Sequence, residues 1–122
     1  MAKVIYLSGP ITEDPYYKKK FNDAEVLLSG RLGHKVLNPA VLPQGLTEAQ
    51  YMRIDLAMLD SADVAVFLPG WENSRGARIE RSYCRKIDKP RFFWNDCEAV
   101  DVELQLQLLD EAIKEATGYG NT

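Results

Sequence analysis

The stretch ADVAVFLPGWENSRGARIERSYC, residues 62–84, decides the fold of this chain. It opens with a continuous run of Val, Phe and Leu, which is typical of a parallel strand with both faces covered. A loop that contains glycine follows, and the residues after it predict a helix that ends at about Ile87. A buried strand that leads through a loop into a helix is the repeating unit of an α/β protein.

The rest of the chain repeats this alternation. The predicted strands lie at 3–9, 34–40, 62–70 and 89–94. The predicted helices lie at 15–32, 47–61, 74–87 and 100–117. This order predicts an α/β fold: a doubly wound, flavodoxin-like parallel sheet of about four to five strands with helices on both faces. We expect a single domain over 1–122, with residues 116–122 as a frayed tail.

Two of these helices carry clear signals. Apolar residues recur at spacings of three and four through Phe21, Ala24, Leu28 and Leu32, and Gly33 is placed as a C-terminal cap. In the second helix, the spacing of Thr47 and Gln50 is that of a capping box. The last helix should cover the sheet with an apolar face formed by Val102, Leu106, Leu109 and Ile113.

The composition excludes several classes of function. The chain has 122 residues and a net charge of −3, whereas a general nucleic-acid binder is normally basic. It has no apolar run long enough to cross a bilayer and no signal-like N-terminus, so we expect a cytoplasmic protein without a membrane partner. The single histidine, His34, and the separated Cys84 and Cys97 form no zinc pattern. We therefore expect neither a metal nor a cofactor.

Three loops are expected at the carboxyl edge of the sheet, where open parallel sheets bind their ligands. They are SGPITED (8–14), NPAVLPQG (38–45) and PGWENSRG (69–76). The first and third contain Gly, Ser or Thr at helix entrances, where free backbone N–H groups and the helix dipole favour an anion. The pattern indicates a small-molecule site that includes an anionic group.

Glu80 is the most informative single residue, because it lies one turn into the helix that faces this site. One interpretation is a solvated carboxylate that pairs with Arg75 or Arg81. The other is a carboxylate kept ionised, with a low pKa, by the surrounding arginines, which suits a nucleophile or an electrostatic stabiliser. Acid–base chemistry needs a second carboxylate, and Asp55 on the preceding helix is the best candidate.

Three motifs resemble those of the nucleoside 2-deoxyribosyltransferase superfamily: IYLSGPI (5–11), DLAMLDSAD (55–63) and SRGARIE (74–80). Among its characterised branches the chain is most similar to the 2′-deoxynucleoside 5′-phosphate N-hydrolases, and overall to an uncharacterised family of that superfamily. The resemblance implies cleavage or base exchange at the N-glycosidic bond of a nucleoside or nucleoside 5′-monophosphate. It implies Glu80 as the nucleophile on C1′, Asp55 as its assistant and Tyr6 as the residue that orients the Glu80 carboxylate.

The resemblance also implies that Gly9, Ser74 and Gly76 line the nucleotide, the last two near the 5′-phosphate. The hydrolase branch has Ser and Arg where this chain has Pro10 and Thr12, so one phosphate contact is missing. We infer, apart from the resemblance, that Arg75 or Arg78 could replace it. The expected substrate-binding residues are Ser8, Gly9, Pro10, Ile11, Trp71, Ser74, Arg75, Gly76 and Arg78.

Several residues have two interpretations. Trp71 either stacks on a base or packs under its loop. Tyr51 and Met52 either wall the base pocket or, as we favour, pack in the core or an interface. Asn38 either binds a base edge or, more simply, forms a turn. His34 is expected at the surface, and Cys84 as a small buried hydrophobe.

A small domain offers a shallow crevice, and the resemblance implies that a partner subunit completes it. We therefore expect a homodimer or a dimer-based assembly, with Tyr51, Met52 and Met58 of the second helix as its surface. The alternative function is a non-catalytic module that binds or senses a nucleotide. The two differ in whether Glu80 and Asp55 approach each other across the crevice.

Overall fold

The computed structural model describes residues 2–94 and 102–118. Cys97 and the final residues, 119–122, of the expected tail lie outside the described residues. The strands are β1 (Val4–Ser8), β2 (Lys35–Leu37), β3 (Val64–Phe67) and β4 (Arg91–Phe93). The helices are α1 (Tyr17–Glu25), η1 (Val26–Arg31), η2 (Pro39–Val41), α2 (Glu48–Ser61), η3 (Trp71–Asn73), α3 (Arg75–Lys86) and α4 (Val102–Thr117).

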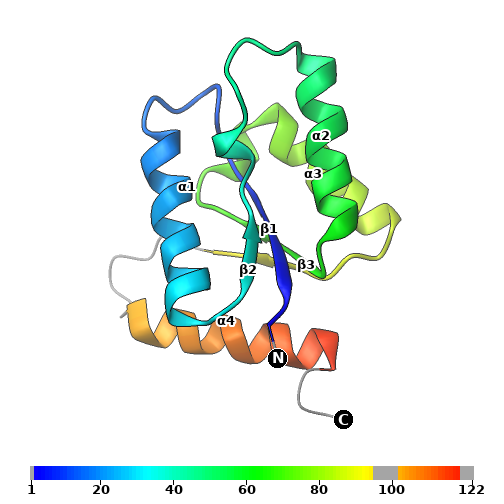
Figure 1. Ribbon diagram of the computed structural model, residues 1–122. Coiled ribbons are helices and arrows are strands. Elements are labelled where there is room, and N and C mark those ends of the chain that lie inside the picture. The colour runs from blue at the N-terminus through cyan, green and yellow to red at the C-terminus, as the bar shows by residue number, and fades with distance from the viewer. Residues whose placement is uncertain (1, 95–101, 119–122) are drawn as a thin grey trace.

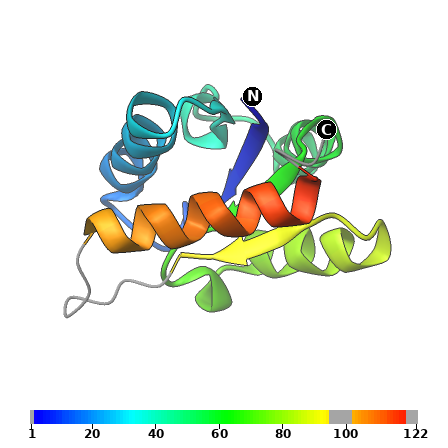
Figure 2. The same ribbon diagram turned by 90° about the horizontal axis from the view of Figure 1, so that it is seen from below.

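All four described strands are parallel, in the order β2-β1-β3-β4. Helices α1 and α4 cover one face of the sheet, and α2 and α3 cover the other (Figures 1 and 2). Side chains alternate along β1, so Ile5 and Leu7 join the core beneath α1 and α4, while Tyr6 joins the core beneath α2 and α3. The predicted α/β fold with a doubly covered parallel sheet is confirmed.

The helix predicted at 15–32 is instead two elements. The α-helical hydrogen bonds end with α1, and the chain continues as one π-helical segment, η1, in which the Leu32 N–H donates to the Leu27 carbonyl. A wider turn at the end of a helix changes which side chains face the core. Leu28 remains fully buried, and Gly33, with φ +76°, ends the segment in the left-handed conformation that glycine adopts readily.

The capping box predicted for α2 is confirmed. The Gln50 N–H donates to the Thr47 hydroxyl over 3.1 Å, and the Thr47 N–H donates to the Gln50 side chain over 2.9 Å. The start of α2 is thereby fixed beside the loop that follows β2. This placement matters for the site, because Asp55 lies two turns further along the same helix.

The apolar face expected on α4 is correct in its centre. Leu106 and Ile113 are buried and Leu109 is partly buried against the same core. Val102 is 48% exposed, because it is the first residue of the helix and extends past the core. The helix runs to Thr117, so residues 116 and 117, expected in a frayed tail, belong to it.

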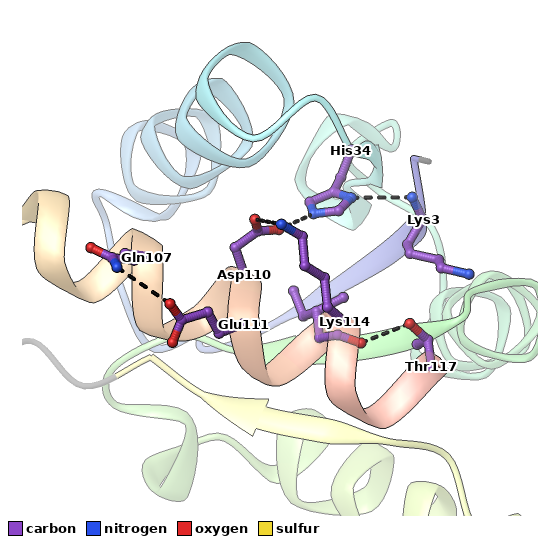
Figure 3. Close-up of polar contacts among 8 residues, drawn as sticks. Lys3, His34, Gln107, Asp110, Glu111, Lys114 and Thr117 are labelled. Carbon is purple, nitrogen blue, oxygen red and sulfur yellow. Dashed lines mark hydrogen bonds and ion pairs between the residues drawn. The ribbon is translucent and has the colours of Figure 1, made fainter. Parts of the chain in front are cut away.

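The expectation that His34 lies at the surface is wrong. Its ring is buried between the start of β1 and α4 (Figure 3). Nδ1 accepts a hydrogen bond from the Lys3 backbone N–H over 3.1 Å, so Nε2 carries the proton and donates to Asp110 over 3.0 Å. Lys114 also pairs with Asp110, at 3.1 Å. The sequence around His34 does not indicate that α4, which comes much later in the chain, packs over this residue.

Two other expectations are confirmed. Asn38 forms a turn, because its side-chain oxygen accepts a hydrogen bond from the Ala40 N–H over 2.9 Å and its amide donates to Glu25 over 2.9 Å. Cys84 is a fully buried, unpaired cysteine in the core under α3.

Candidate functional site

A cavity of about 600 Å³ lies at the carboxyl edge of the sheet. The loops after β1, β2 and β3 all contribute to its walls, as the sequence predicts, and α2 and α3 complete them. Strand β1 has β2 on one side and β3 on the other, so the cavity lies where the chain reverses its direction of travel through the sheet. Its floor is the end of β1, with Tyr6 and Ser8.

Glu80 enters this cavity from α3 and is only 4% exposed. The helix begins at Ser74, whose hydroxyl accepts a hydrogen bond from the Ala77 N–H over 3.2 Å. Ala77, Glu80 and Cys84 then share the buried face of α3. The Ser8 hydroxyl donates to the Glu80 carboxylate over 2.6 Å, so a residue on the sheet holds the side chain of a residue on the helix.

The environment of Glu80 raises its pKa to about 8. Burial is the largest cause, because it penalises the charged form. The Ser8 hydrogen bond lowers the pKa, and the negative charge of Asp55 raises it. The expectation that Glu80 has a low pKa and stays ionised is therefore wrong for the free protein.

Asp55 and Tyr6 lie close enough to Glu80 for each to affect its ionisation. Burial raises the pKa of Asp55 to about 6, and its contact with Glu80 acts in the opposite direction. Burial raises the pKa of Tyr6 well above its usual value, and the charges of Glu80 and Asp55 add to this effect. Within the described part of the chain, neither the Tyr6 hydroxyl nor Asp55 Oδ1 has a partner at normal hydrogen-bond geometry, although both atoms are buried. Both residues are therefore close neighbours of Glu80, and the Tyr6 hydroxyl and Asp55 Oδ1 keep hydrogen-bonding capacity that a ligand could use.

The three arginines do not surround Glu80. Arg75 lies at the rim of the cavity, with its side chain 74% exposed and 3.8 Å from the carboxylate of Glu48. Arg78 donates to the backbone carbonyl of Glu72 over 2.9 Å. The guanidinium of Arg81 lies 5.8 Å from the centre of the Trp71 ring. The expected cluster does not form because of the helical periodicity of α3. The arginines are close to Glu80 in sequence, but their side chains point to other sides of the helix.

The structure brings six of the expected substrate-binding residues to the cavity: Ser8, Gly9, Ile11, Ser74, Arg75 and Gly76. It does not bring the other three there. Pro10 lines a separate hollow of about 240 Å³, and Arg78 is turned away. Trp71 packs against Phe67 and Phe93, with ring centres 5.5 and 5.1 Å away, so packing is the correct interpretation of this residue.

The sequence favours core or interface packing for Tyr51 and Met52, whereas in the structure both residues line the cavity. They lie four and three residues, respectively, before Asp55 on α2, a spacing that places all three on the same side of the helix and could have identified them. The Tyr51 hydroxyl also donates to the Pro43 carbonyl over 2.6 Å, which fixes the loop after β2 against α2. The wall that α2 contributes to the cavity therefore includes an aromatic and a thioether side chain.

Two further properties concern the described ranges, 2–94 and 102–118. Within them, no three His, Cys, Asp or Glu side chains cluster in a way that could hold a metal ion. No helix in these ranges has the length and apolar character that a bilayer crossing requires.

One family model matches the chain, over residues 3–92, and its description is "Domain of unknown function (DUF4406)". The matched range contains all four strands except the last residue of β4, and every cavity residue named above. A comparison with curated proteins finds no match.

Proposed function

We propose that this chain, which belongs to the DUF4406 family, cleaves or exchanges the base at the N-glycosidic bond of a (deoxy)nucleoside or nucleoside 5′-monophosphate. One observation carries the proposal. A buried glutamate, Glu80, and a second carboxylate, Asp55, lie side by side in an open cavity at the ligand-binding edge of the sheet. Paired carboxylates next to a sugar are the usual means of breaking a glycosidic bond.

The raised pKa values suggest how the pair would divide the chemistry. At neutral pH the free protein holds a proton on Glu80, whose pKa is about 8, while Asp55, with a pKa of about 6, is mostly ionised. Moving that proton from Glu80 to Asp55 leaves Glu80 as a carboxylate and Asp55 as an acid. Two carboxyl groups in contact share a proton readily, because both cannot be charged at low cost.

The ionised Glu80 would then attack C1′ of the sugar. The C1′–N bond breaks, its electron pair goes to the departing base, and Asp55 donates its proton to that base. The product is a glycosyl ester on Glu80. Attack by water on C1′ would complete hydrolysis, and attack by the nitrogen of a second base would complete exchange. In both cases the C1′–O bond to Glu80 breaks, Glu80 leaves as a carboxylate, and Asp55 takes the proton of the attacking group.

A nucleotide-binding module without turnover is the second candidate. The observation in its favour is the deep burial of Glu80, which raises its pKa and favours the neutral carboxylic acid, a poor nucleophile. In this case the cavity would bind a nucleoside through the hydrogen-bonding capacity of Tyr6 and Asp55 without breaking it.

The test is incubation with a panel of nucleosides and nucleoside 5′-monophosphates, with free base measured by chromatography. We expect base release by the native protein and none by Glu80→Gln, which keeps the shape of the side chain. Glu72→Gln, which changes an exposed carboxylate near the entrance of α3, serves as the matched control and should stay active. Binding of several nucleosides without release of any base would favour the module.

The role of Asp55 can be tested separately with the leaving group. Asp55→Asn should lower the release of ordinary bases by roughly 10²–10⁴-fold, the usual contribution of a general acid or base. It should affect 7-methylguanosine much less, because that base already carries a positive charge and needs no proton to leave. Equal losses for both substrates would show that Asp55 does not deliver the proton.

A further inference from the structure

Ser8 occupies a fixed position at the end of β1. Its side chain is fully buried, and its carbonyl accepts a hydrogen bond from the Leu68 N–H over 2.7 Å. Ser8 is also in register with Phe67 of β3. Parallel pairing on the central strand therefore fixes the backbone, and the hydroxyl has little freedom to move.

That hydroxyl is already engaged. It donates to Oε1 of Glu80 over 2.6 Å, a short distance that is typical of a hydrogen bond to a carboxylate. Tyr6, two residues earlier on the same face of β1, and Asp55 are also near Glu80 and affect its ionisation, but in the described ranges neither the Tyr6 hydroxyl nor Asp55 Oδ1 has a partner at normal hydrogen-bond geometry. Among the described residues, Ser8 thus provides the one side-chain hydrogen bond of normal geometry to Glu80.

We propose that Ser8 is a positioning residue for Glu80, which aims the carboxylate into the cavity and stabilises its ionised form, and that it is not a substrate contact. The catalytic meaning of this role rests on the proposed function, whereas the effect on the ionisation of Glu80 does not. Ser8 is among the substrate-binding residues expected from the sequence. The geometry separates it from them, because its single proton points at Glu80 and not into the cavity.

The physical argument compares the two charge states of Glu80. A hydroxyl that donates to a carboxylate favours the charged form, and the loss of the Ser8 hydroxyl leaves only the contact with Tyr6 to oppose burial and the charge of Asp55. The titratable groups that face Glu80 are Tyr6 from β1, Asp55 from α2 and Cys84 from α3. Ionised Asp55 repels a negative charge on Glu80, whereas Tyr6, whose own pKa burial raises, stays neutral and favours that charge through its hydroxyl. The thiol, whose pKa burial raises to about 11, is neutral at physiological pH.

The first experiment measures ionisation directly and needs no substrate. The protein is labelled with ¹³C at the glutamate carboxyl carbon, and Glu80→Gln identifies the Glu80 signal in NMR spectra. Ser8→Ala should raise the pH midpoint of that signal by about one unit, the scale of a lost hydrogen bond to a charged group. Ser8→Thr, which keeps the hydroxyl, should restore the native midpoint. An unchanged midpoint in a folded Ser8→Ala protein would overturn the proposal.

The second experiment uses turnover, once a substrate is found. Ser8→Ala should lower kcat/KM by about tenfold at neutral pH, because the proton that the two carboxyl groups share then stays on Glu80 and leaves it less often as a nucleophile. The alkaline limb of the pH profile should move upward by about one unit, because Glu80 then loses that proton at a higher pH. A loss confined to KM, with an unshifted pH profile, would mean that Ser8 contacts substrate. If no substrate is ever found, the NMR titration still decides the role of Ser8, so the two proposals fail separately. If Ser8→Ala does not fold, Ser8→Cys keeps a similar volume with a weaker donor and should show a smaller shift in the same direction.

Discussion

At the scale of single residues, the burial of Glu80 has a consequence for stability. Its pKa rises from 4.5 to about 8 on folding, so the folded chain holds this proton more tightly than the unfolded chain. The contribution to stability is therefore fully present below about pH 4.5 and is lost as the pH rises towards 8. We predict that the free energy of unfolding falls across this window.

Glu80→Gln should remove most of that fall, because glutamine imitates the protonated side chain. At pH 8 the variant should be more stable than the native protein by on the order of a few kcal/mol. Urea unfolding at a series of pH values measures this, with Glu72→Gln as the exposed control. Identical pH dependence in Glu80→Gln and the native protein would show that Glu80 is not buried in solution.

Arg75 and Arg78 form a matched pair for testing phosphate recognition. Arg75 lies at the rim of the cavity near the start of α3, whereas Arg78 is held by the Glu72 carbonyl outside it. Arg75→Ala should weaken the binding of nucleoside 5′-monophosphates by roughly 1.5–3 kcal/mol, the scale of a charge-assisted hydrogen bond, and leave unphosphorylated nucleosides almost unaffected. Isothermal titration with both ligand types gives the answer, and Arg78→Ala should change neither. Equal losses for both ligand types would assign Arg75 a structural role.

At the scale of elements, the sequence predicts type and order well, since these depend on local patterns. Each strand is a short apolar run, and the caps at Thr47 and Gly33 are local signals. The errors come from contacts between distant segments. The burial of His34 depends on α4, and the packing of Trp71 depends on Phe93 of β4. The ionisation of Glu80 depends on depth of burial, which no local pattern reports.

For the candidate site, the motifs predict which side chains lie together better than they predict the ionisation of those side chains. Glu80, Asp55 and Tyr6 come from three elements and lie together at one edge of the sheet. The arginines that follow Ser74 are close to Glu80 in sequence but leave the helix at other angles. A carboxylate that looks paired in the sequence is thus a buried one with a raised pKa.

Gly76, in the first turn of α3, leaves space at the cavity that a larger residue would fill. Glycine destabilises a helix by roughly 0.5–1 kcal/mol relative to alanine. A methyl group at Gly76 would meet only Met52 Cε and Ser74 Oγ, both at an ordinary 4.0 Å, so the protein itself does not require glycine there. The position lines the cavity, so the space that the missing methyl group leaves is available to a ligand.

We predict that Gly76→Ala raises the free energy of unfolding by about 0.5–1 kcal/mol and weakens nucleotide binding. Gly30→Ala is the matched control, because Gly30 lies in η1 with no atom within 4 Å of the added methyl group. It should stabilise the fold similarly without affecting binding. Chemical denaturation and titration calorimetry on the same samples separate the two effects. Unchanged nucleotide affinity in Gly76→Ala would place the ligand elsewhere in the cavity.

At the scale of the whole molecule, the cavity is open on one side. The Glu48 side chain at its rim is 90% exposed, and so is most of Arg75. An oxocarbenium-like centre needs protection from bulk water, which a second copy of the chain would provide. Tyr51 and Met52 face the cavity, and Met58 packs on the core, so a partner would contact the neighbouring exposed residues of α2, Arg53 and Ala57.

We therefore predict a homodimer whose interface includes Arg53 and Ala57. Ala57→Arg should convert it to a monomer in light scattering and lower turnover, because a bulky charge on each copy meets its equivalent across a twofold axis. Leu108→Arg is the control, since Leu108 is 55% exposed on α4, which lies away from the cavity loops in Figure 1. That variant should remain dimeric and active. Turnover per protomer in the native protein should also decrease on dilution below the dimer dissociation constant. A chain that is monomeric and fully active at every concentration would mean that the cavity excludes water by itself, through closure of its own loops over the ligand.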